Sequence, residues 1–472
     1  MIVNYVIVLI TSIFIIGHNR NPVSTLSYIL SMIVFPFVGI LVYLFFGQEY
    51  RKEKMFQRKG VVDNKKIKEW EKKLLLSEEK LEEYESKFLD EKVKGVRLLQ
   101  NNQKKPLTFK NQVKVLINGE EKFKSLFADL KKAEHHIHVE YYIFNSDTIG
   151  TKLIDILCEK VKEGLEVRVS YDYVASDLSN AAIKKMKTCG IEVFPFMPVR
   201  FPNLTRRLNY RDHRKIVVID GEIGYVGGIN VCDEYVNPTK NGVYWRDTHV
   251  RLSGNAVKSL QSHFLLNWNF VSNSEIEIKD EYFPKVKQKP GKAVQVAASG
   301  PDSDWPNIME AIFTAINSAE KYIYITTPYF IPNDQIITAL KTASRSGVEV
   351  KLLIPKDGDS WVTQFATDSY IQDLLESGIE VNHYCKGMVH AKTMVIDDEL
   401  SMIGTSNMDY RSFEINFEIT AMIYSEEIAK EMLTIFEKDI EECDTVDLEK
   451  WRKRPSHKKW KESFCRLWAP LL

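Results

Sequence analysis

The sequence predicts an α/β protein in which two duplicated domains surround a pseudo-two-fold axis, preceded by an N-terminal two-helix transmembrane hairpin. Strand-like runs alternate with helical segments from residue 108 onward, which is the pattern of α/β proteins. The order of these runs occurs twice, which indicates internal duplication. Residues 1–46 are mostly apolar and differ in kind from the rest of the chain.

The hairpin, assigned to residues 1–48, rests on two apolar runs. Residues 2–16 are short for a bilayer span, which needs about 17–25 residues, whereas residues 26–46 are long enough and uncharged. A signal peptide is the alternative for the first run, but a basic start and a cleavage site of small residues are missing. The loop between the two apolar runs has one basic residue, Arg20, whereas several basic residues follow the hairpin. The positive-inside rule therefore places the bulk of the protein in the cytoplasm. These basic residues are Arg51, Lys52, Lys54, Arg58 and Lys59.

A charged connector is predicted over residues 49–107, with one helix over residues 63–95. Apolar residues recur there at every seventh position, which indicates an amphipathic helix. Polar residues interrupt the seam, so we favour a helix that lies on the following domains or on the membrane over a dimerising zipper. The apolar positions are Ile67, Leu74, Leu81 and Phe88.

Composition bounds the function. The 472 residues are enough for two domains, and 64 basic residues balance 64 acidic residues, so the chain as a whole does not attract nucleic acid. The six cysteines are scattered, with neither a C-x-x-C pair nor a zinc-like cluster. We therefore expect no disulfide framework and no structural metal, and a reducing compartment.

The two halves are assigned to residues 108–280 and 290–443, with a junction near 275–292 and a basic, aromatic tail at 444–472. Two equivalent sheets packed around the axis would bring matching segments of both halves together. Strands are expected at 112–117, 136–144, 165–173, 191–196 and 215–220, and again at 293–299, 322–330, 348–354, 379–384 and 392–397, with helices such as 149–162 and 334–345 between them.

One motif, His-x-Lys-x-x-x-x-Asp, occurs once in each half. It reads HRKIVVID at 213–220 and HAKTMVID at 390–397, followed by GGIN at 227–230 and GTSN at 404–407. Each piece alone is unremarkable, but its complete repetition at equivalent points of a duplicated chain indicates one shared active site. The candidate catalytic residues are His213, Lys215, Asp220, His390, Lys392 and Asp397.

A His-x-Lys pair suits attack on an anionic phosphodiester. Residues two apart on a strand share a face, so the lysine can neutralise oxygen charge while the histidine acts as nucleophile or acid. Asn230 and Asn407 can donate hydrogen bonds to the same phosphate oxygens, and such a cradle needs no metal or cofactor. Of the residues after the glycine turns, only the second half offers a hydroxyl, at Thr405 and Ser406.

A nucleophilic histidine needs a carboxylate to hold its tautomer. Glu418, on a strand-like run downstream of His390, is the candidate orienter in the second half, and Asp247 is the matching candidate in the first half. Asp220 and Asp397 lie on the opposite strand face from the lysines, so we expect them to buttress the glycine turns rather than to touch substrate.

These motifs resemble the phospholipase D superfamily and, within it, the bacterial cardiolipin synthases. The resemblance covers the hairpin and the stretches NYRDHRKIVVIDGEIGYVGGIN, YWRDTHVRL and MVHAKTMVIDDELSMIGTSNMDYRSFEINFEI. It implies two phospholipase-D-like domains and transfer of a phosphatidyl group between two phosphatidylglycerols through a phosphohistidine, with release of glycerol. By the same resemblance, His213 is the nucleophile and His390 the acid and then the base, and the enzyme is a multi-pass protein of the bacterial plasma membrane.

Two other functions are compatible with the motifs. A phosphodiesterase would hydrolyse phospholipid or, as the superfamily's nucleases do, nucleic acid. Balanced charge and the hairpin disfavour a nuclease, so phosphatidylglycerol and other anionic phospholipids are the expected partners, and nucleic acid is not. A membrane scaffold with a decayed site is disfavoured because both motif sets are complete. The oligomeric state stays open.

Two basic segments are further candidates for membrane contact. Arginines cluster just before the first motif and can attract anionic headgroups. Residues 450–468 mix basic with aromatic side chains, which fits either an interfacial anchor or a solvated tail whose aromatics cap the core. Pro455 interrupts any single helix there. The arginines are Arg206, Arg207, Arg211 and Arg214.

Overall fold

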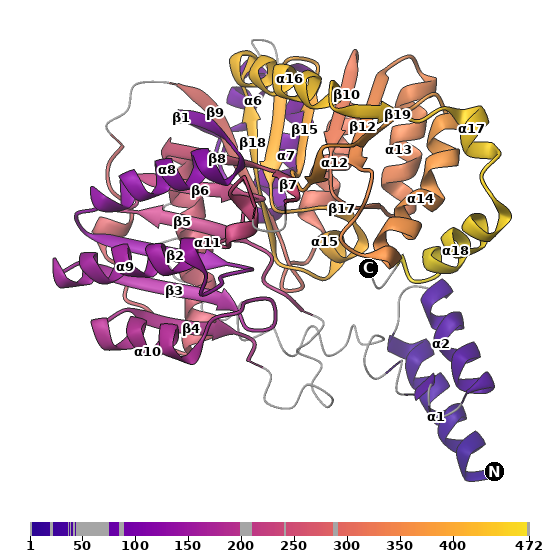
Figure 1. Ribbon diagram of the computed structural model, residues 1–472, viewed down its shortest axis with the longest axis horizontal. Coiled ribbons are helices and arrows are strands. Elements are labelled where there is room, and N and C mark those ends of the chain that lie inside the picture. Colours follow the sequence, from indigo (N-terminus) through magenta and orange to yellow (C-terminus); the bar gives the residue numbers. More distant parts are fainter. Residues whose placement is uncertain are drawn as a thin grey trace.

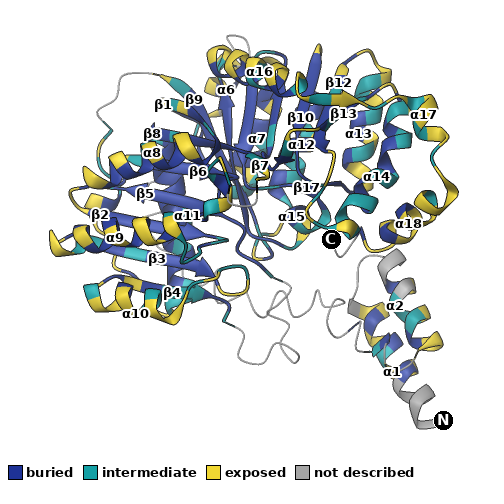
Figure 2. Cartoon of the chain, in the orientation of Figure 1, coloured by how far each residue is buried: buried dark blue, intermediate teal, exposed yellow. Residues whose placement is uncertain are grey.

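The body of the protein is an α/β fold built on one 15-stranded sheet of parallel and antiparallel strands, with helices on both faces (Figure 1). The computed structural model describes residues 2–18, 22–35, 37, 39–40, 43, 75–84, 89–198, 210–239, 242–286 and 291–469. Most strand residues are buried (Figure 2). On one strand, Val217 and Ile219 pack into the core cluster under the helices of one face, while Ile216 and Val218 pack into the cluster of the other face. This alternation is what a sheet covered on both sides requires.

The first seven strands come in the same order when read outward from the centre in either direction, and the second half adds a further strand at its outer edge. In the first half it runs β1 (Thr108–Ile117), β8 (Thr248–Gly254), β6 (Ile223–Gly227), β5 (Lys215–Ile219), β2 (His136–Tyr141), β3 (Glu166–Asp172) and β4 (Glu192–Phe196). In the second half it runs β9 (Lys292–Ser299), β18 (Glu418–Tyr424), β16 (Leu400–Gly404), β15 (Thr393–Ile396), β10 (Tyr322–Thr326), β12 (Glu349–Pro355), β13 (Glu380–Tyr384) and β19 (Cys443–Thr445).

The expectation of two separate packed sheets is wrong. Strands β1 and β9 pair antiparallel and join the halves edge to edge, with Thr108 opposite Val294 and Asn111 opposite Lys292. The Asn111 side chain donates to Lys292 O (3.0 Å) and so reinforces the seam. Pairing removes two exposed sheet edges, which explains why one continuous sheet forms. The duplication itself is present as predicted.

Equivalent helices cover equivalent strands. The first half has α8 (Asn118–Lys131), α9 (Thr148–Lys162), α10 (Asn180–Cys189) and α11 (Ala256–Ser272), and the second has α12 (Asn307–Asn317), α13 (Asp334–Arg345), α14 (Trp361–Glu376) and α16 (Glu426–Ile440). Capping fixes several starts: Asp147 accepts a hydrogen bond from Gly150 N (3.0 Å), and Asn333 accepts one from Ile336 N (3.2 Å). The helices predicted at 149–162 and 334–345 therefore form.

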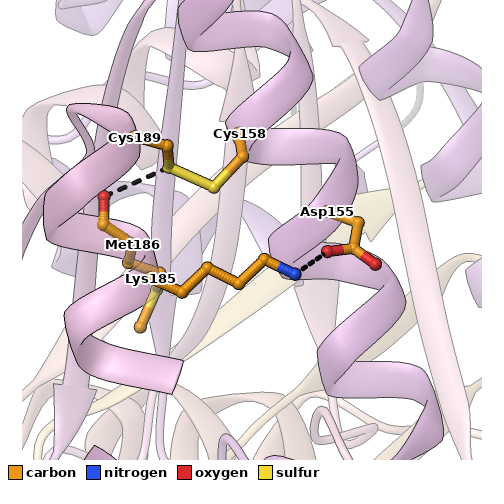
Figure 3. Close-up of a disulfide and its surroundings, with 5 residues drawn as sticks. All are labelled: Asp155, Cys158, Lys185, Met186 and Cys189. Carbon is orange, nitrogen blue, oxygen red and sulfur yellow. Dashed lines mark hydrogen bonds and ion pairs between the residues drawn. A yellow bond between two sulfur atoms is a disulfide. The ribbon is translucent and has the colours of Figure 1, made fainter. Parts of the chain in front are cut away.

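A disulfide between Cys158 and Cys189 corrects the expectation that the cysteines are unpaired (Figure 3). It joins α9 to α10, and an ion pair between Asp155 and Lys185 links the same two helices. The two cysteines are separated by 31 residues in sequence, but their Cα atoms lie 5.5 Å apart. The packing of neighbouring helices creates this proximity, and cysteine spacing alone does not reveal it.

The N-terminal region forms two helices, α1 (Ile2–His18) and α2 (Pro22–Val34), which pack on each other. Buried side chains between them include Val8, Ile15 and Met32, while large apolar side chains such as Leu9 and Ile13 face outward. None of the helices within the described ranges is both long and apolar enough to cross a bilayer. Two helices therefore form where the hairpin was predicted, but the structure does not confirm that they span a membrane, and part of the second apolar run lies outside the described residues.

The predicted continuous helix over 63–95 is wrong where the structure describes it; residues 63–74 and 85–88 lie outside the described residues. Residues 75–77 are not helical, and they are followed by α6 (Glu78–Tyr84), η2 (Asp90–Lys92) and α7 (Val93–Gln103). The Gln100 side chain holds the break because it accepts from Leu76 N (2.9 Å) and donates to Leu76 O (2.8 Å). Leu81 is fully buried in the second-half core, so this segment lies on the body as favoured.

Candidate active site

Each motif histidine is held by the opposite half of the chain. Just before β5, His213 N donates to Phe417 O (3.0 Å), and Phe417 N donates to Arg211 O (2.9 Å). In the second half, β14 (Gly387–Val389) pairs parallel with β7 (Tyr244–Arg246), and His390 N donates to Arg246 O (2.7 Å). Both connections cross between halves, so the two motifs meet at one place.

The same crossing decides which carboxylate orients which histidine. Glu418 accepts from His213 Nδ1 through both oxygens, at 2.8 and 3.0 Å, and Asp247 accepts from His390 Nδ1 at 2.8 Å. Both candidate orienters therefore contact a histidine, but the predicted partners are exchanged. Sequence reasoning assigned each carboxylate to the histidine of its own half, whereas each follows directly on the residue that bridges to the opposite motif.

Protonation follows from this geometry. A carboxylate that accepts from Nδ1–H leaves the lone pair on Nε2, the form that attacks phosphorus or accepts a proton. Burial, opposed by Glu418, lowers the pKa of His213 to about 4. Burial and then the charge of Lys392 lower the pKa of His390 to about 3. Both imidazoles are therefore neutral at pH 7.

The two lysines differ in what they contact. Lys215 Nζ donates to the carbonyl oxygen of His213 (2.7 Å). Lys392 Nζ contacts the His390 carbonyl and lies 3.0 Å from its Nε2 and 2.7 Å from its Nδ1. Because Nδ1–H donates to Asp247, the ring position open to Lys392 is Nε2. His213 Nε2, by contrast, has no hydrogen-bond partner among the described residues.

Burial also shifts the lysines. It lowers the pKa of Lys215 to about 7 and that of Lys392 to about 8, and the charges of Glu418 and Asp247 oppose both shifts. Lys392 further lowers the pKa of Lys215, which shows that the two motif sets lie within electrostatic reach of each other. The site thus gathers positive charge from both halves, as binding of an anionic diester requires.

The motif aspartates lie away from the histidines. Each sits in a turn with positive φ, +53° at Asp220 and +56° at Asp397, and accepts backbone N–H groups at the start of a neighbouring strand. The structure therefore does not bring them to the reacting groups. Each aspartate thus ties its turn to the start of a neighbouring strand, β2 for Asp220 and β10 for Asp397. The backbone N–H donors are Glu134, His135 and His136 for Asp220, and Glu320, Lys321 and Tyr322 for Asp397.

The asparagines lie in the buried shell of the site. Asn230 Oδ1 accepts from Ile143 N (3.2 Å), and its Nδ2 donates to Tyr235 OH (2.8 Å), which is 3.3 Å from His390 Nδ1. Asn407 N–H donates to Ser412 Oγ (3.2 Å). The backbone and side-chain bonds fix both residues, and a phosphate contact by either amide stays a prediction.

Three aromatic side chains that line the site were not predicted from the sequence. Tyr142 lies edge-on to His213, with ring centroids 4.6 Å apart, and Tyr235 and Trp245 each lie 5.5 Å from the His390 ring. These rings contribute to the burial that keeps both histidines neutral. Trp245 stands in the quoted string YWRD, two residues before Asp247, but nothing in its spacing marks it as a neighbour of His390.

Other polar residues near the motifs serve the protein itself. Thr405, noted as a possible phosphate contact, donates to Glu418 instead. Arg211 is buried and paired with Asp172 (3.0 Å), and Arg214 donates to Glu418 O (3.3 Å), so both are structural rather than open to lipid headgroups. Arg206 and Arg207 lie outside the described residues. Within the described ranges, no cluster of three or more His, Cys, Asp or Glu side chains is suited to a metal ion.

Comparison with known proteins agrees with this geometry. The family described as "Cardiolipin synthase, PLD-like domain" matches residues 126–264 and 312–440, and "Phospholipase_D-nuclease N-terminal" matches residues 6–48. The chain belongs to the cardiolipin synthase family of phospholipase-D-like proteins. Within this family it is 39% identical over 457 residues to the cardiolipin synthase of Geobacillus sp. (strain WCH70), covering 96% of this chain and 90% of that protein.

A second relative and one solved structure extend the comparison. Cardiolipin synthase 2 of Bacillus anthracis is 40% identical over 470 residues, covering 98% of this chain and 90% of that protein. The crystal structure of phosphatidylserine synthase from Haemophilus influenzae Rd KW20 superposes with a TM-score of 0.62 at 15% identity, covering 80% of this chain and 100% of that one. At that identity, the structural likeness shows a shared fold alone.

Proposed function

We propose that this member of the cardiolipin synthase family transfers the phosphatidyl group of one phosphatidylglycerol to a second, giving cardiolipin and glycerol. One observation carries the proposal beyond family membership: two neutral histidines, each oriented by a carboxylate and accompanied by a lysine, meet in one buried site. A phosphoryl transfer with a covalent intermediate needs a nucleophile and a separate proton carrier, and this arrangement supplies both.

In the first step His213 Nε2 attacks the phosphorus of the donor lipid, and the bond from phosphorus to the glycerol oxygen breaks. What supports His213 as nucleophile is that its Nε2 has no partner within the described residues, whereas Nε2 of His390 is next to Lys392 (3.0 Å). His390 protonates the leaving oxygen. It takes up that proton as the diester binds, because a nearby negative charge raises a histidine pKa and Lys392 is a donor in contact.

In the second step the hydroxyl of another phosphatidylglycerol gives its proton to His390 and attacks phosphorus. The bond from phosphorus to His213 Nε2 breaks, so the free histidine is restored and cardiolipin leaves. Lys215 and Lys392 neutralise the non-bridging oxygens in both steps, and Asn230 and Asn407 are proposed to help hold them. Only residues of the chain are needed to balance these protons and charges.

We also propose that α1 and α2 insert in the bacterial plasma membrane as a hairpin, with the two catalytic halves, 108–280 and 290–443, on the cytoplasmic side. What supports insertion is the outward-facing apolar surface of these helices and the family match over residues 6–48. A membrane location fits a lipid substrate that does not leave the bilayer. The outward-facing side chains include Leu9, Ile10, Ile13, Leu26, Leu30 and Ile33.

The test is product analysis with purified full-length enzyme and vesicles of phosphatidylglycerol labelled in the headgroup and in the phosphate. We expect cardiolipin and free glycerol in equal amounts. Phosphatidic acid as the main product would show that water rather than a lipid hydroxyl resolves the intermediate, and would assign phospholipid hydrolysis instead. Cleavage of nucleic acid in place of lipid would contradict the proposal altogether.

A further inference from the structure

The C-terminal helix α18 (Ser456–Arg466) and the helical turn after it carry an apolar stripe that points away from the protein. Trp460, Phe464, Leu467 and Trp468 stand at positions i, i+4, i+7 and i+8, which is the spacing of one helix face. Their exposed fractions are 78%, 55%, 77% and 48%. An amphipathic helix of a globular protein normally points such a stripe at the core, so this one is arranged for contact with something else.

The opposite face of α18 holds the helix in this orientation. Cys465 and Glu462 are buried against the body, and Glu462 forms an ion pair with Arg454 (2.7 Å). Arg454 also donates to Gln372 Oε1 on α14 (3.1 Å). The Arg466 guanidinium lies over the ring of Tyr370, 4.4 Å from its centroid. These contacts fix the rotation of the helix and keep the aromatic stripe outward.

The neighbouring helix extends the stripe. Trp361, at the start of α14, is 64% exposed and packs edge-on against Phe365. Lys461 Nζ lies 5.4 Å above the Phe365 ring and so joins the two helices. We call Trp361, Trp460, Phe464, Leu467 and Trp468 together the C-terminal apolar surface.

Positive charge surrounds this surface. Residues 448–468 carry eight lysines and arginines against two glutamates, whereas the chain as a whole has no net charge. Several of these basic side chains are exposed at the rim. They include Lys453, Lys458, Lys461 and Arg466.

We propose that the C-terminal apolar surface docks on an anionic phospholipid bilayer. Tryptophans and phenylalanine enter the boundary between headgroups and acyl chains, and the rim lysines pair with lipid phosphates. A second protein fits less well, because protein interfaces are depleted in lysine around their aromatic centres. A second copy of this chain would in addition bring two basic rims together.

The position of the surface relates docking to the active site. Trp361 follows closely after Asp359, which receives a hydrogen bond from Tyr329 OH (2.6 Å) and whose charge acts on Lys392. Docking through this edge therefore brings the bilayer beside the second-half motif. In Figure 1 the hairpin and α18 both lie at the lower right of the body. A hairpin and a docked edge together would hold the site at a fixed height over its lipid substrate.

The experiment measures burial of α18 in the bilayer and does not depend on catalysis. A spin label is placed at Leu467→Cys in full-length protein carrying Cys385→Ser, reconstituted in vesicles with phosphatidylglycerol. We expect the label to be reached by oxygen more readily than by an aqueous nickel reagent. The matched control, Lys430→Cys on exposed helix α16, is expected to show aqueous accessibility in the same vesicles.

The second part of the experiment changes the charge of the lipid or of the protein. In vesicles of phosphatidylcholine alone, or with Lys458→Gln and Lys461→Gln, the ratio of docked to undocked label is expected to fall, by about fivefold for each lysine removed. A Leu467 label as aqueous as the Lys430 label in anionic vesicles would overturn the proposal. So would label immobilisation that depends on protein concentration in detergent, since that identifies a second copy as the occupant. Either result can coexist with full transferase activity, so it leaves the proposed function standing.

Discussion

The two halves of the site share a frame but differ in how each carboxylate is supported. In the second half, Glu418 receives the hydroxyl of Thr405 and holds His213 with both oxygens. In the first half, the position of Thr405 is taken by Gly228, where a Cβ atom would lie 2.1 Å from Asp247 Oδ1. Glu418, which accepts from the Thr405 hydroxyl, and the shorter Asp247, which packs against Gly228, thus both orient a histidine. Duplication supplied the frame, and the support of each histidine then diverged.

The surroundings of the lysines diverge as well. Strand register sets Tyr141 and His249 of the first half at the positions of Thr327 and Thr420 in the second. The large first-half side chains are buried together, whereas the small threonines line a hollow beside Lys392. The difference leaves room next to Lys392, and it supports separate roles for the two histidines although their motifs are alike.

Replacing the histidines should have the largest effect. His213→Asn and His390→Asn should each reduce cardiolipin formation by roughly 10⁶-fold, because each removes one of two groups that act as a unit. Reactions with phosphate-labelled lipid, quenched with detergent at alkaline pH because a phosphohistidine hydrolyses in acid, would distinguish the roles. Label bound covalently to His390→Asn but not to His213→Asn is expected; the reverse pattern would exchange nucleophile and acid.

Neutralising the orienting carboxylates should come next. Glu418→Gln and Asp247→Asn preserve size but no longer favour the correct tautomer, which costs roughly 10³- to 10⁴-fold in kcat in a comparable triad. We expect the larger loss in Glu418→Gln, because one amide oxygen cannot replace the two carboxylate oxygens that accept from His213 and Thr405. Steady-state assays measure this, with circular dichroism as the folding control. Near-normal turnover in either variant would mean that its histidine needs no orienter.

The lysines should impose an alkaline limit. Because burial lowers the pKa of Lys215 to about 7 and that of Lys392 to about 8, kcat/KM for phosphatidylglycerol should decline as pH rises through this range and the site loses positive charge. Their effect on stability has the opposite sign. The unfolded chain, with lysine pKa near 10.5, binds more protons from about pH 7 to 10.5, so their contribution to stability rises with pH there.

Lys215→Arg and Lys392→Arg test this assignment, since arginine keeps its charge throughout. We expect their kcat/KM values to be lower overall at neutral pH, but the part of the decline due to the replaced lysine should vanish. An unchanged alkaline limb in both variants would assign it to another group.

The motif aspartates should show the smallest catalytic effect. Asp220→Asn and Asp397→Asn weaken charged hydrogen bonds to strand starts, worth about 2 kcal/mol of unfolding free energy. Asp397→Asn should cost more, because Asp397 also pairs with buried Lys92 (3.0 Å). Denaturant unfolding checks the stability, and activity per folded molecule should stay close to that of the wild type. A catalytic loss as large as that of the histidine variants would contradict the structural role.

Much of this arrangement could be predicted from sequence because it is local. Runs such as KIVVID and KTMVID predict buried strands, and the repeated His-x-Lys spacing places the histidine and lysine side chains on one face of the strand. Glu418 and Asp247 were identified as orienters, but their partners were not. Their pairing depends on Phe417 and Arg246 bridging to the opposite half, a contact between segments far apart in the chain.

The remaining differences have the same physical origin. The seam between β1 and β9 joins two strand edges whose pairing is a tertiary event, and the Cys158–Cys189 disulfide depends on how α9 packs on α10. The break at Leu76 is set by Gln100 from a later helix, which overrides the local helical pattern. Local periodicity therefore identifies elements, whereas long-range pairing decides where they end and what they face.

The most direct test of the reciprocal site is the nitrogen NMR signature of the two imidazoles. In full-length protein labelled with ¹⁵N-histidine, and assigned through His213→Asn and His390→Asn, both rings should carry the proton on Nδ1 at pH 7. Glu418→Gln should shift only the His213 resonances and Asp247→Asn mainly those of His390, because each carboxylate contacts the histidine of the other motif. Glu418→Gln shifting His390 while leaving His213 unchanged would contradict the crossed pairing on which the proposed mechanism rests.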